Sequence, residues 1–228
     1  MNAFHSKLQD NLLAVQEKIR FAAQQSGANQ TVCLIAVSKT QPHSVVEAAF
    51  EAGQCDFGEN YIQEGVDKIA ALSHHRAELV WHMIGPIQSN KTRLVAEQFD
   101  WVHTIDRLKT AQRLSEQRPS GLAPLQCLVQ VNIDSEASKS GVAPSEVSDL
   151  LATVGALPNL QLRGLMCIPH ANNRLAFAQM KALFDALNAG GHTLDVLSMG
   201  MSADFEQAIA CGSTHVRVGS AIFGARAA

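Results

Sequence analysis

The sequence lacks the features that mark membrane and secreted proteins. No run reaches the ~20 uninterrupted apolar residues that a membrane-spanning helix requires. The first ten residues mix Asn, His, Lys, Gln and Asp, and they contain no apolar region of a secretory signal. We therefore expect a cytoplasmic protein with no membrane partner.

Positive charge is also scarce. The chain has 18 Lys and Arg against 21 Asp and Glu, which gives a formal net charge of −3, and aromatic residues make up 5%. There is no basic run and no interleaving of basic with aromatic residues. Nucleic-acid backbones bind clustered positive charge, so we expect no nucleic-acid partner.

Paired cysteines are missing as well. The five cysteines are scattered along the chain, and no two have the C-x-x-C spacing of zinc sites or redox pairs. The sequence therefore predicts no metal site. We interpret the cysteines as small buried hydrophobic residues in a reducing compartment.

What the chain does contain is ample apolar content, 46% of 228 residues, in a regular order. An amphipathic helix is expected over residues 3–25, because Leu8, Leu12, Val15 and Ile19 recur at steps of three and four. Short apolar runs then alternate with helical patterns. The expected strands are 32–37, 55–57, 79–84, 101–104, 125–131, 160–166, 193–197 and 215–218. The expected helices begin near His43, Tyr61, Ile87, Arg107, Pro144, Arg174 and Ala203, with a last short piece over 221–226.

This alternation predicts the fold class. Several runs, such as 32–37, are apolar throughout, which is typical of parallel strands covered by helices on both sides. Eight strand–helix units predict a (β/α)8 TIM barrel with an extra N-terminal helix, in one domain spanning residues 1–228. An open doubly wound sheet is the alternative, but no glycine-rich phosphate turn follows the first strand.

Lys39 is the sharpest candidate for chemistry. It follows the most apolar strand of the chain, and in such barrels the site lies where strands end. Partial desolvation lowers the pKa of a lysine, and a free amine condenses with an aldehyde to a Schiff base. The carbonyl compound that reacts with this amine could be pyridoxal 5′-phosphate (PLP), a sugar phosphate or a keto acid. The alternative is a surface lysine with a solvated head group.

The last two strands offer an anion site. Ser198–Ser202 precedes one expected helix, and Gly219 with Ser220 precedes the last one. Loops at these places of a barrel often bind phosphate. Ser202 has a second interpretation as a plain helix cap. Arg217 is expected to point into the barrel, opposite to its neighbours Val216 and Val218, either toward a ligand or into a buried salt bridge with an acid.

Seven strings in register resemble the pyridoxal phosphate homeostasis protein family, also called the YggS/PROSC family. The strings are Ala36–Thr40, Phe57–Tyr61, Trp81–Lys91, Ser138–Gly141, Gly164–Met166, Ser198–Ser202 and Arg217–Gly224. The resemblance runs from about Val32 to Ala225, which is nearly the whole chain.

The resemblance implies a barrel like the N-terminal domain of alanine racemase, with PLP bound to Lys39 as a Schiff base. It further implies that Ser202, Gly219 and Ser220 hold the phosphate and that Arg217 faces the pyridine nitrogen. By the same resemblance, the other pocket residues are Asn60, His82 and Met199.

The resemblance also implies a function in vitamin B6 homeostasis rather than catalysis. Racemases of this fold add a tyrosine base from a second domain, whereas this chain has a single tyrosine, Tyr61. We expect a monomer that holds PLP and hands it to PLP-dependent apo-enzymes. Lys139 is either a transient acceptor of the cofactor or a solvated loop lysine, and Gln41 stands where some relatives carry a second lysine.

Three rival functions stay open at this point. The first is a PLP-dependent amino-acid racemase. The second is an aldolase that uses Lys39 on a sugar phosphate, and the third is a binding module for a protein partner.

Overall fold

A computed structural model describes residues 3–27, 31–134, 136, 140–171, 173 and 175–224. The strands are β1 (Cys33–Val37), β2 (Asp56–Glu59), β3 (Val80–Met83), β4 (Trp101–Ile105), β5 (Leu125–Val131), β6 (Leu160–Cys167), β7 (Val196–Met201) and β8 (His215–Val218). The α-helices are α1 (Ala3–Gln25), α2 (His43–Glu51), α3 (Ile62–Ala71), α4 (Thr92–Gln98), α5 (Leu108–Gln117), α6 (Val147–Gly155), α7 (Ala176–Ala189), α8 (Phe205–Ala210) and α9 (Ser220–Phe223). Short 3-10 turns are η1 (Ser73–His75), η2 (Ser89–Lys91) and η3 (Pro144–Glu146).

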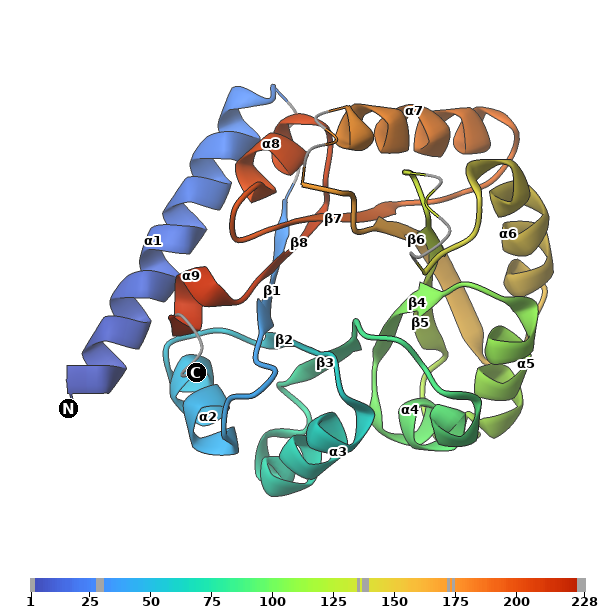
Figure 1. Cartoon of the computed structure of the whole chain (residues 1–228). Coiled ribbons are helices and arrows are strands. Elements are labelled where there is room, and N and C mark those ends of the chain that lie inside the picture. Colours follow the sequence, from blue (N-terminus) through green and yellow to red (C-terminus); the bar gives the residue numbers. More distant parts are fainter. Residues whose placement is uncertain are drawn as a thin grey trace.

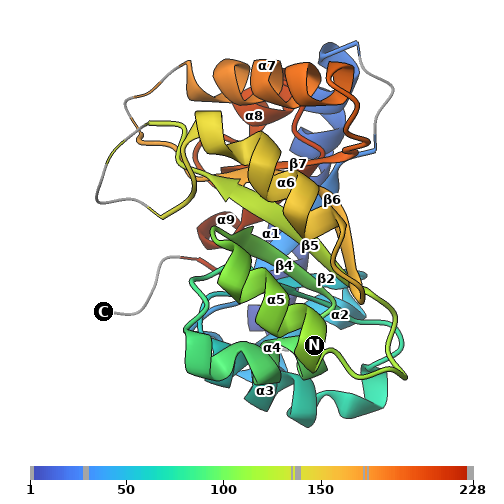
Figure 2. The same ribbon diagram turned by 90° about the vertical axis from the view of Figure 1, so that its right-hand side faces the viewer.

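The strands form a closed parallel barrel in sequence order, from β1 to β8. Closure is made by β8, which pairs in parallel with β1 so that Arg217 lies opposite Ile35. The predicted TIM barrel is therefore confirmed, and the open-sheet alternative is wrong. The helices follow one another around the outside of the sheet (Figures 1 and 2).

The extra N-terminal helix lies across one side of the barrel. Leu8, Leu12, Val15 and Ile19 of α1 are buried in the main hydrophobic core, as their spacing predicts. Figure 1 shows α1 beside α8 and α9, and the Asn11 amide donates a hydrogen bond of 2.9 Å to the Ile222 carbonyl. The helix therefore covers the strands at the point where the barrel closes.

Side chains alternate between two environments along each strand. Val216 and Val218 of β8 belong to the core between strands and helices, whereas Arg217 between them hydrogen-bonds inside the barrel. On β1, the same alternation buries Leu34 and Ala36 in that outer core. The side chain of residue 39 is therefore expected to point into the barrel, as those of Ile35 and Val37 do.

Two expectations about local structure are wrong. The seventh strand was expected to end at residue 197, but β7 continues to Met201, because Met199 is fully buried against the outer core. The cysteines were expected to be buried, but Cys55 is exposed and Cys33 and Cys211 are half-buried. All five are free thiols, and only Cys127 and Cys167 behave as core residues.

Candidate functional site

The site is built around Lys39, which follows β1 and is half-buried at the mouth of the barrel. Its side chain lines a cavity of about 460 Å³ at the carboxyl ends of the strands. Six of the eight predicted site residues line this one cavity: Lys39, Asn60, Ser202, Arg217, Gly219 and Ser220. The apolar part of the cavity wall consists of Val37, Ile84, Ile168 and Phe223.

A buried ion network holds the turn that carries Lys39. The ammonium of Lys68 donates to the Ser38 carbonyl and to the Glu59 carboxylate, each at 2.7 Å. The Ser38 hydroxyl donates to the same Glu59 oxygen at 2.6 Å. Burial raises the pKa of Glu59, while Lys68 and then Ser38 oppose that rise. The residue before Lys39 is thus fixed by charge-assisted hydrogen bonds.

The residue after Lys39 is fixed by the same network. Thr40 has a φ of 66°, in the left-handed region that threonine rarely adopts. Its backbone N–H donates to the Glu64 carboxylate at 2.5 Å, and Lys68 also binds Glu64 at 2.7 Å. Strained backbone at such a position persists only where its surroundings enforce it.

The opposite wall of the cavity is rich in hydrogen-bond donors. The backbone N–H groups of Gly219 and Ala221 point at the Ser202 hydroxyl oxygen, at 3.2 and 3.4 Å. A Cβ added at Gly219 would lie 3.2 Å from the Val37 carbonyl oxygen, so glycine keeps the two strands' ends close. The interpretation of Ser202 as a helix cap is wrong, because the N-cap residue of α8 is Asp204.

Arg217 lies beneath this wall and is 4% exposed. Its guanidinium donates to the Ser198 hydroxyl at 2.6 Å and to the Cys167 carbonyl at 2.9 Å. Among the residues that the structure describes, no carboxylate forms a salt bridge with it, so the alternative of a buried ion pair is wrong. Burial lowers the pKa of Arg217, but guanidinium groups stay protonated in proteins.

Two predicted pocket residues do not reach the cavity. His82 points inward from β3, but below the cavity, where its ring contacts His103 and Asp56. Met199 points outward from β7, into the hydrophobic core between strands and helices. Lys139 and Ser138 lie outside the described residues, whereas Gln41 lines the cavity beside Thr40.

Sequence reasoning gave no role to the network of Lys68, Glu64 and Glu59. One signal was available, since Glu64 and Lys68 stand four residues apart on a helix. That spacing alone does not distinguish a solvated pair from a buried one. The partner that decides the matter, Glu59, comes from a different strand.

A larger cavity of about 640 Å³ lies at the other end of the barrel, lined by α1 and the first residues of β1 and β2. It contains Arg20, Cys33 and Asp56 but no lysine. In barrels of this kind, chemistry takes place at the carboxyl ends of the strands. The smaller cavity is therefore the candidate site.

The donor set of the smaller cavity fits an anionic aldehyde. It combines an amine, a buried guanidinium, serine hydroxyls and backbone N–H groups. The Asn60 side-chain oxygen is buried and has no hydrogen-bond partner within the described structure, so a bound molecule can supply one. The fold and the site together define a TIM-barrel protein whose cavity at the strand ends has the donors that suit a small phosphorylated carbonyl compound.

Comparison with known proteins names the family. A family profile described as alanine racemase, N-terminal domain, matches residues 11–227. A protein of Haemophilus influenzae named pyridoxal phosphate homeostasis protein is 52% identical over 227 residues, covering 96% of each chain. The chain therefore belongs to the pyridoxal phosphate homeostasis protein family, within the alanine racemase N-terminal domain fold.

Solved structures agree with this assignment. PipY of Synechococcus elongatus, whose structure has PLP bound, is 33% identical with a TM-score of 0.81, covering 95% of this chain and all of PipY. Alanine racemase of Clostridium difficile has a TM-score of 0.75 at 15% identity and covers 98% of this chain but 58% of the racemase. The second likeness concerns the fold alone.

The helices in the described part of the chain are too short or too polar to span a lipid bilayer.

Proposed function

We propose that this chain binds PLP covalently through Lys39 and serves as a carrier in vitamin B6 homeostasis, without strong catalytic activity of its own. The observation that carries the proposal is the convergence of Lys39, Arg217 and Ser202 on one cavity. The family name of its relatives and the PLP-bound PipY structure support it.

The proposed attachment is a simple condensation. The uncharged Nζ of Lys39 attacks the aldehyde carbon, a C=N bond forms, and one water molecule leaves. Val37 and Ile84 beside Lys39 reduce its access to water. We expect the cofactor phosphate to be held by the Ser202 and Ser220 hydroxyls and by the N–H of Gly219.

Arg217 would then face the pyridine nitrogen. Because a guanidinium does not release its proton, it keeps an adjacent ring nitrogen unprotonated. An unprotonated ring is a poor electron sink. Tyr61, the single tyrosine of the sequence, is 60% exposed and does not line the cavity. These features favour holding the cofactor over catalysis with it.

The test is a spectrum followed by trapping. Purified protein incubated with PLP is expected to gain a visible absorption band and, after borohydride reduction, to carry one pyridoxyl group on the peptide that contains Lys39. Lys39→Ala should lose both signals, and Lys109→Ala, which changes an exposed lysine of α5, should keep them. Label on any other residue would overturn the proposal.

The second candidate is a PLP-dependent amino-acid racemase, which the fold of alanine racemase favours. It predicts that PLP-loaded protein exchanges the α-proton of alanine for deuterium in heavy water. The carrier proposal predicts no exchange above that of free PLP. It also predicts that loaded protein, as a monomer in gel filtration, activates a PLP-dependent apo-enzyme.

A further inference from the structure

A continuous hydrogen-bonded chain crosses the barrel interior beneath the candidate site. It begins at the guanidinium of Arg217, which lies 2.6 Å from the Ser198 hydroxyl. That hydroxyl lies 3.0 Å from Nδ1 of His103, and Nε2 of His103 lies 3.0 Å from Nδ1 of His82. Nε2 of His82 lies 3.0 Å from the Asp56 carboxylate.

The chain connects the two ends of the barrel. Arg217 lines the cavity at the carboxyl ends of the strands, whereas Asp56 begins β2 and lines the cavity at the other end. Ser198, His103 and His82 are fully buried between them. Side chains from β8, β7, β4, β3 and β2 thus form one path through the protein.

The chemistry of its ends gives the chain a direction. A guanidinium can only donate hydrogen bonds, and an ionised carboxylate can only accept them. The Ser198 proton then goes to His103, the Nε2 proton of His103 goes to His82, and the Nε2 proton of His82 goes to Asp56. Every bond is satisfied when both imidazoles are neutral and carry their proton on Nε2.

The surroundings favour this arrangement. Burial is the main cause that lowers the pKa of His103 well below its usual value, and the nearby guanidinium of Arg217 acts in the same direction. The neutral form of His103 is the form that this hydrogen-bonded chain requires.

We propose that Asp56, His82 and His103 are positioning residues for Arg217: anchored at the far end of the barrel, they fix the direction in which its guanidinium faces the cavity. The link to PLP rests on the proposed function. The hydrogen-bonded chain involves only side chains of this protein, so the chain and the proposed function can fail separately.

The first test uses protein without cofactor. Imidazole 15N NMR at pH 7 should show that His82 and His103 are both neutral, with an unprotonated Nδ1 and a protonated Nε2. In Asp56→Leu the uniform protonation of Nε2 on both rings should be lost. In Asp56→Asn it should be partly retained, because the amide oxygen can still accept a hydrogen bond from His82. A protonated Nδ1 on either ring of the wild type would contradict the proposed order of hydrogen bonds.

The second test measures PLP. Asp56→Leu and His82→Phe should raise the dissociation constant about fivefold or more, corresponding to ~1 kcal/mol, and shift the bound-cofactor absorption. The control is His192→Gln, since His192 lies on the surface 3.3 Å from Ser148 and contacts no member of the hydrogen-bonded chain. Unchanged affinity and spectrum in both variants would overturn the positioning role. A wild type that binds no PLP, with the NMR pattern intact, would instead overturn the proposed function.

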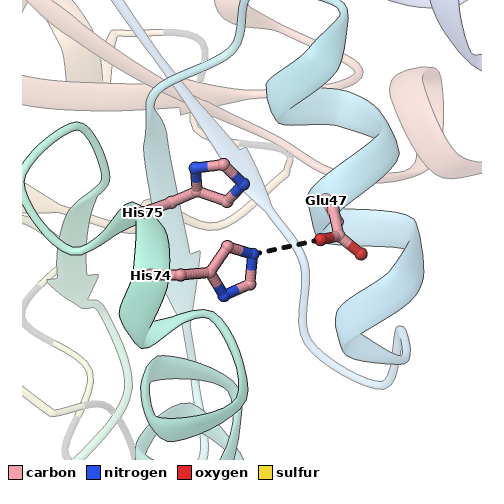
Figure 3. A group of neighbouring side chains, drawn as sticks. All are labelled: Glu47, His74 and His75. Atoms are coloured by element: carbon pink, nitrogen blue, oxygen red, sulfur yellow. Dashed lines mark hydrogen bonds and ion pairs between the residues drawn. The ribbon is translucent and has the colours of Figure 1, made fainter.

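An independent observation lies on the outer surface, between α2 and η1. Glu47, His74 and His75 place one ligand atom each within 4.8 Å of one another (Figure 3). His74 Nε2 lies 3.3 Å from the Glu47 carboxylate, and the His75 ring packs 4.4 Å from the ring of Phe50. A second acid, Glu78, lies 3.5 Å from His75 Nδ1.

We infer that this group binds a divalent transition-metal ion such as Zn²⁺, with two imidazoles and one carboxylate as ligands. Nitrogen and oxygen donors of this kind suit zinc, and three protein ligands leave a position for water. The side chains of His74 and Glu47 are 56% and 38% exposed, so an ion can reach them without opening the fold. This site is separate from the cavity of Lys39.

Calorimetric titration of the intact chain with zinc chloride tests the inference. We expect saturable binding of one ion per chain, weakened about tenfold or more in His74→Ala and in Glu47→Ala, as expected when a coordinating ligand is lost. His192→Ala, which removes a histidine elsewhere on the surface, should leave binding unchanged. Equal binding by His74→Ala and the wild type would overturn the site.

Discussion

Lys68 and Glu59 form a buried ion pair directly behind the turn that carries Lys39. Their atoms Nζ and Oε1 lie 2.7 Å apart, and the side chains are 5% and 0% exposed. The pair joins α3 to β2 and, through Ser38, to the end of β1. It therefore fixes the backbone on either side of Lys39.

Lys68→Met should destabilise the fold by ~3 kcal/mol at pH 7, because it leaves the Glu59 charge buried without its partner. Burial already raises the pKa of Glu59, and the loss of Lys68 raises it further. A folded-state pKa above the unfolded one means that stability is lost as pH rises through that window. The deficit should therefore shrink when unfolding in urea is measured at pH 5 instead of pH 7.

The control for this variant is Lys181→Met. Lys181 binds Asp185 at 2.6 Å, but the two side chains are 40% and 58% exposed. Exposed pairs contribute about 0–1 kcal/mol, so little change is expected. A Lys68→Met deficit as small as that of the control would contradict the buried-pair account.

Sequence periodicity predicts the direction of side chains better than their depth. The alternation along the last strand places Arg217 inside the barrel, and the position of Lys39 just after the most apolar strand places it at the barrel mouth. His82 faces the interior too, but it lies one layer too deep to line the cavity. The depth of a residue depends on how the strands are staggered around the barrel, which no single strand reveals.

Partners from distant segments are also beyond the sequence pattern. Ser198 lies 95 residues from His103 along the chain and yet contacts it in the barrel. Glu59 of β2 pairs with Lys68 of α3, which the sequence pattern of either segment alone does not reveal. Such pairings follow from closure of the sheet, which is a property of the whole chain.

Ser202→Ala should weaken retention of PLP by ~1–2 kcal/mol, because it removes a hydrogen bond to a charged group. Without the cofactor, stability should fall only slightly, because the Ser202 hydroxyl accepts two long hydrogen bonds from the N–H groups of Gly219 and Ala221 but is not the N-cap of α8. Equilibrium dialysis of PLP and a urea titration measure the two effects. Ser148→Ala, at an exposed position of α6, is the control, and equal retention in both variants would remove Ser202 from the phosphate site.

Stability should fall as the pH is lowered from 7 toward 4. Burial is the main cause that lowers the pKa of His215, from 6.5 to about 4. Between these values the unfolded chain binds a proton that the folded chain does not, so each pH unit costs ~1.4 kcal/mol for this one group. His103 acts in the same direction.

His215→Gln should flatten this dependence, since glutamine does not titrate. Urea unfolding at pH 7, 5.5 and 4.5 would show a smaller slope of stability against pH than in the wild type. His192→Gln, which changes a surface histidine, should keep the wild-type slope. A His215→Gln slope equal to that of the wild type would mean that folding does not change the pKa of His215.

Gly85 follows β3 at the point where the backbone of Asn60 crosses it. A Cβ at this position would lie 2.1 Å from the Asn60 carbonyl oxygen, which is backbone and cannot turn away. The Gly85 carbonyl also accepts the Thr104 hydroxyl at 2.7 Å, so the segment is held from the other side. Gly85→Ala must displace Asn60, whose side chain lines the cavity.

We expect Gly85→Ala to cost ~1–3 kcal/mol of stability, as overpacked sites do, and to weaken PLP binding along with it. Gly121→Ala is the matched control, because a Cβ there meets no atom within 4 Å and the backbone φ is not in the left-handed region. Thermal unfolding and PLP titration of the two variants separate a local clash from a general effect of replacing glycine. If Gly85→Ala bound PLP as tightly as Gly121→Ala, Asn60 could move without loss, and the cavity would not depend on its position.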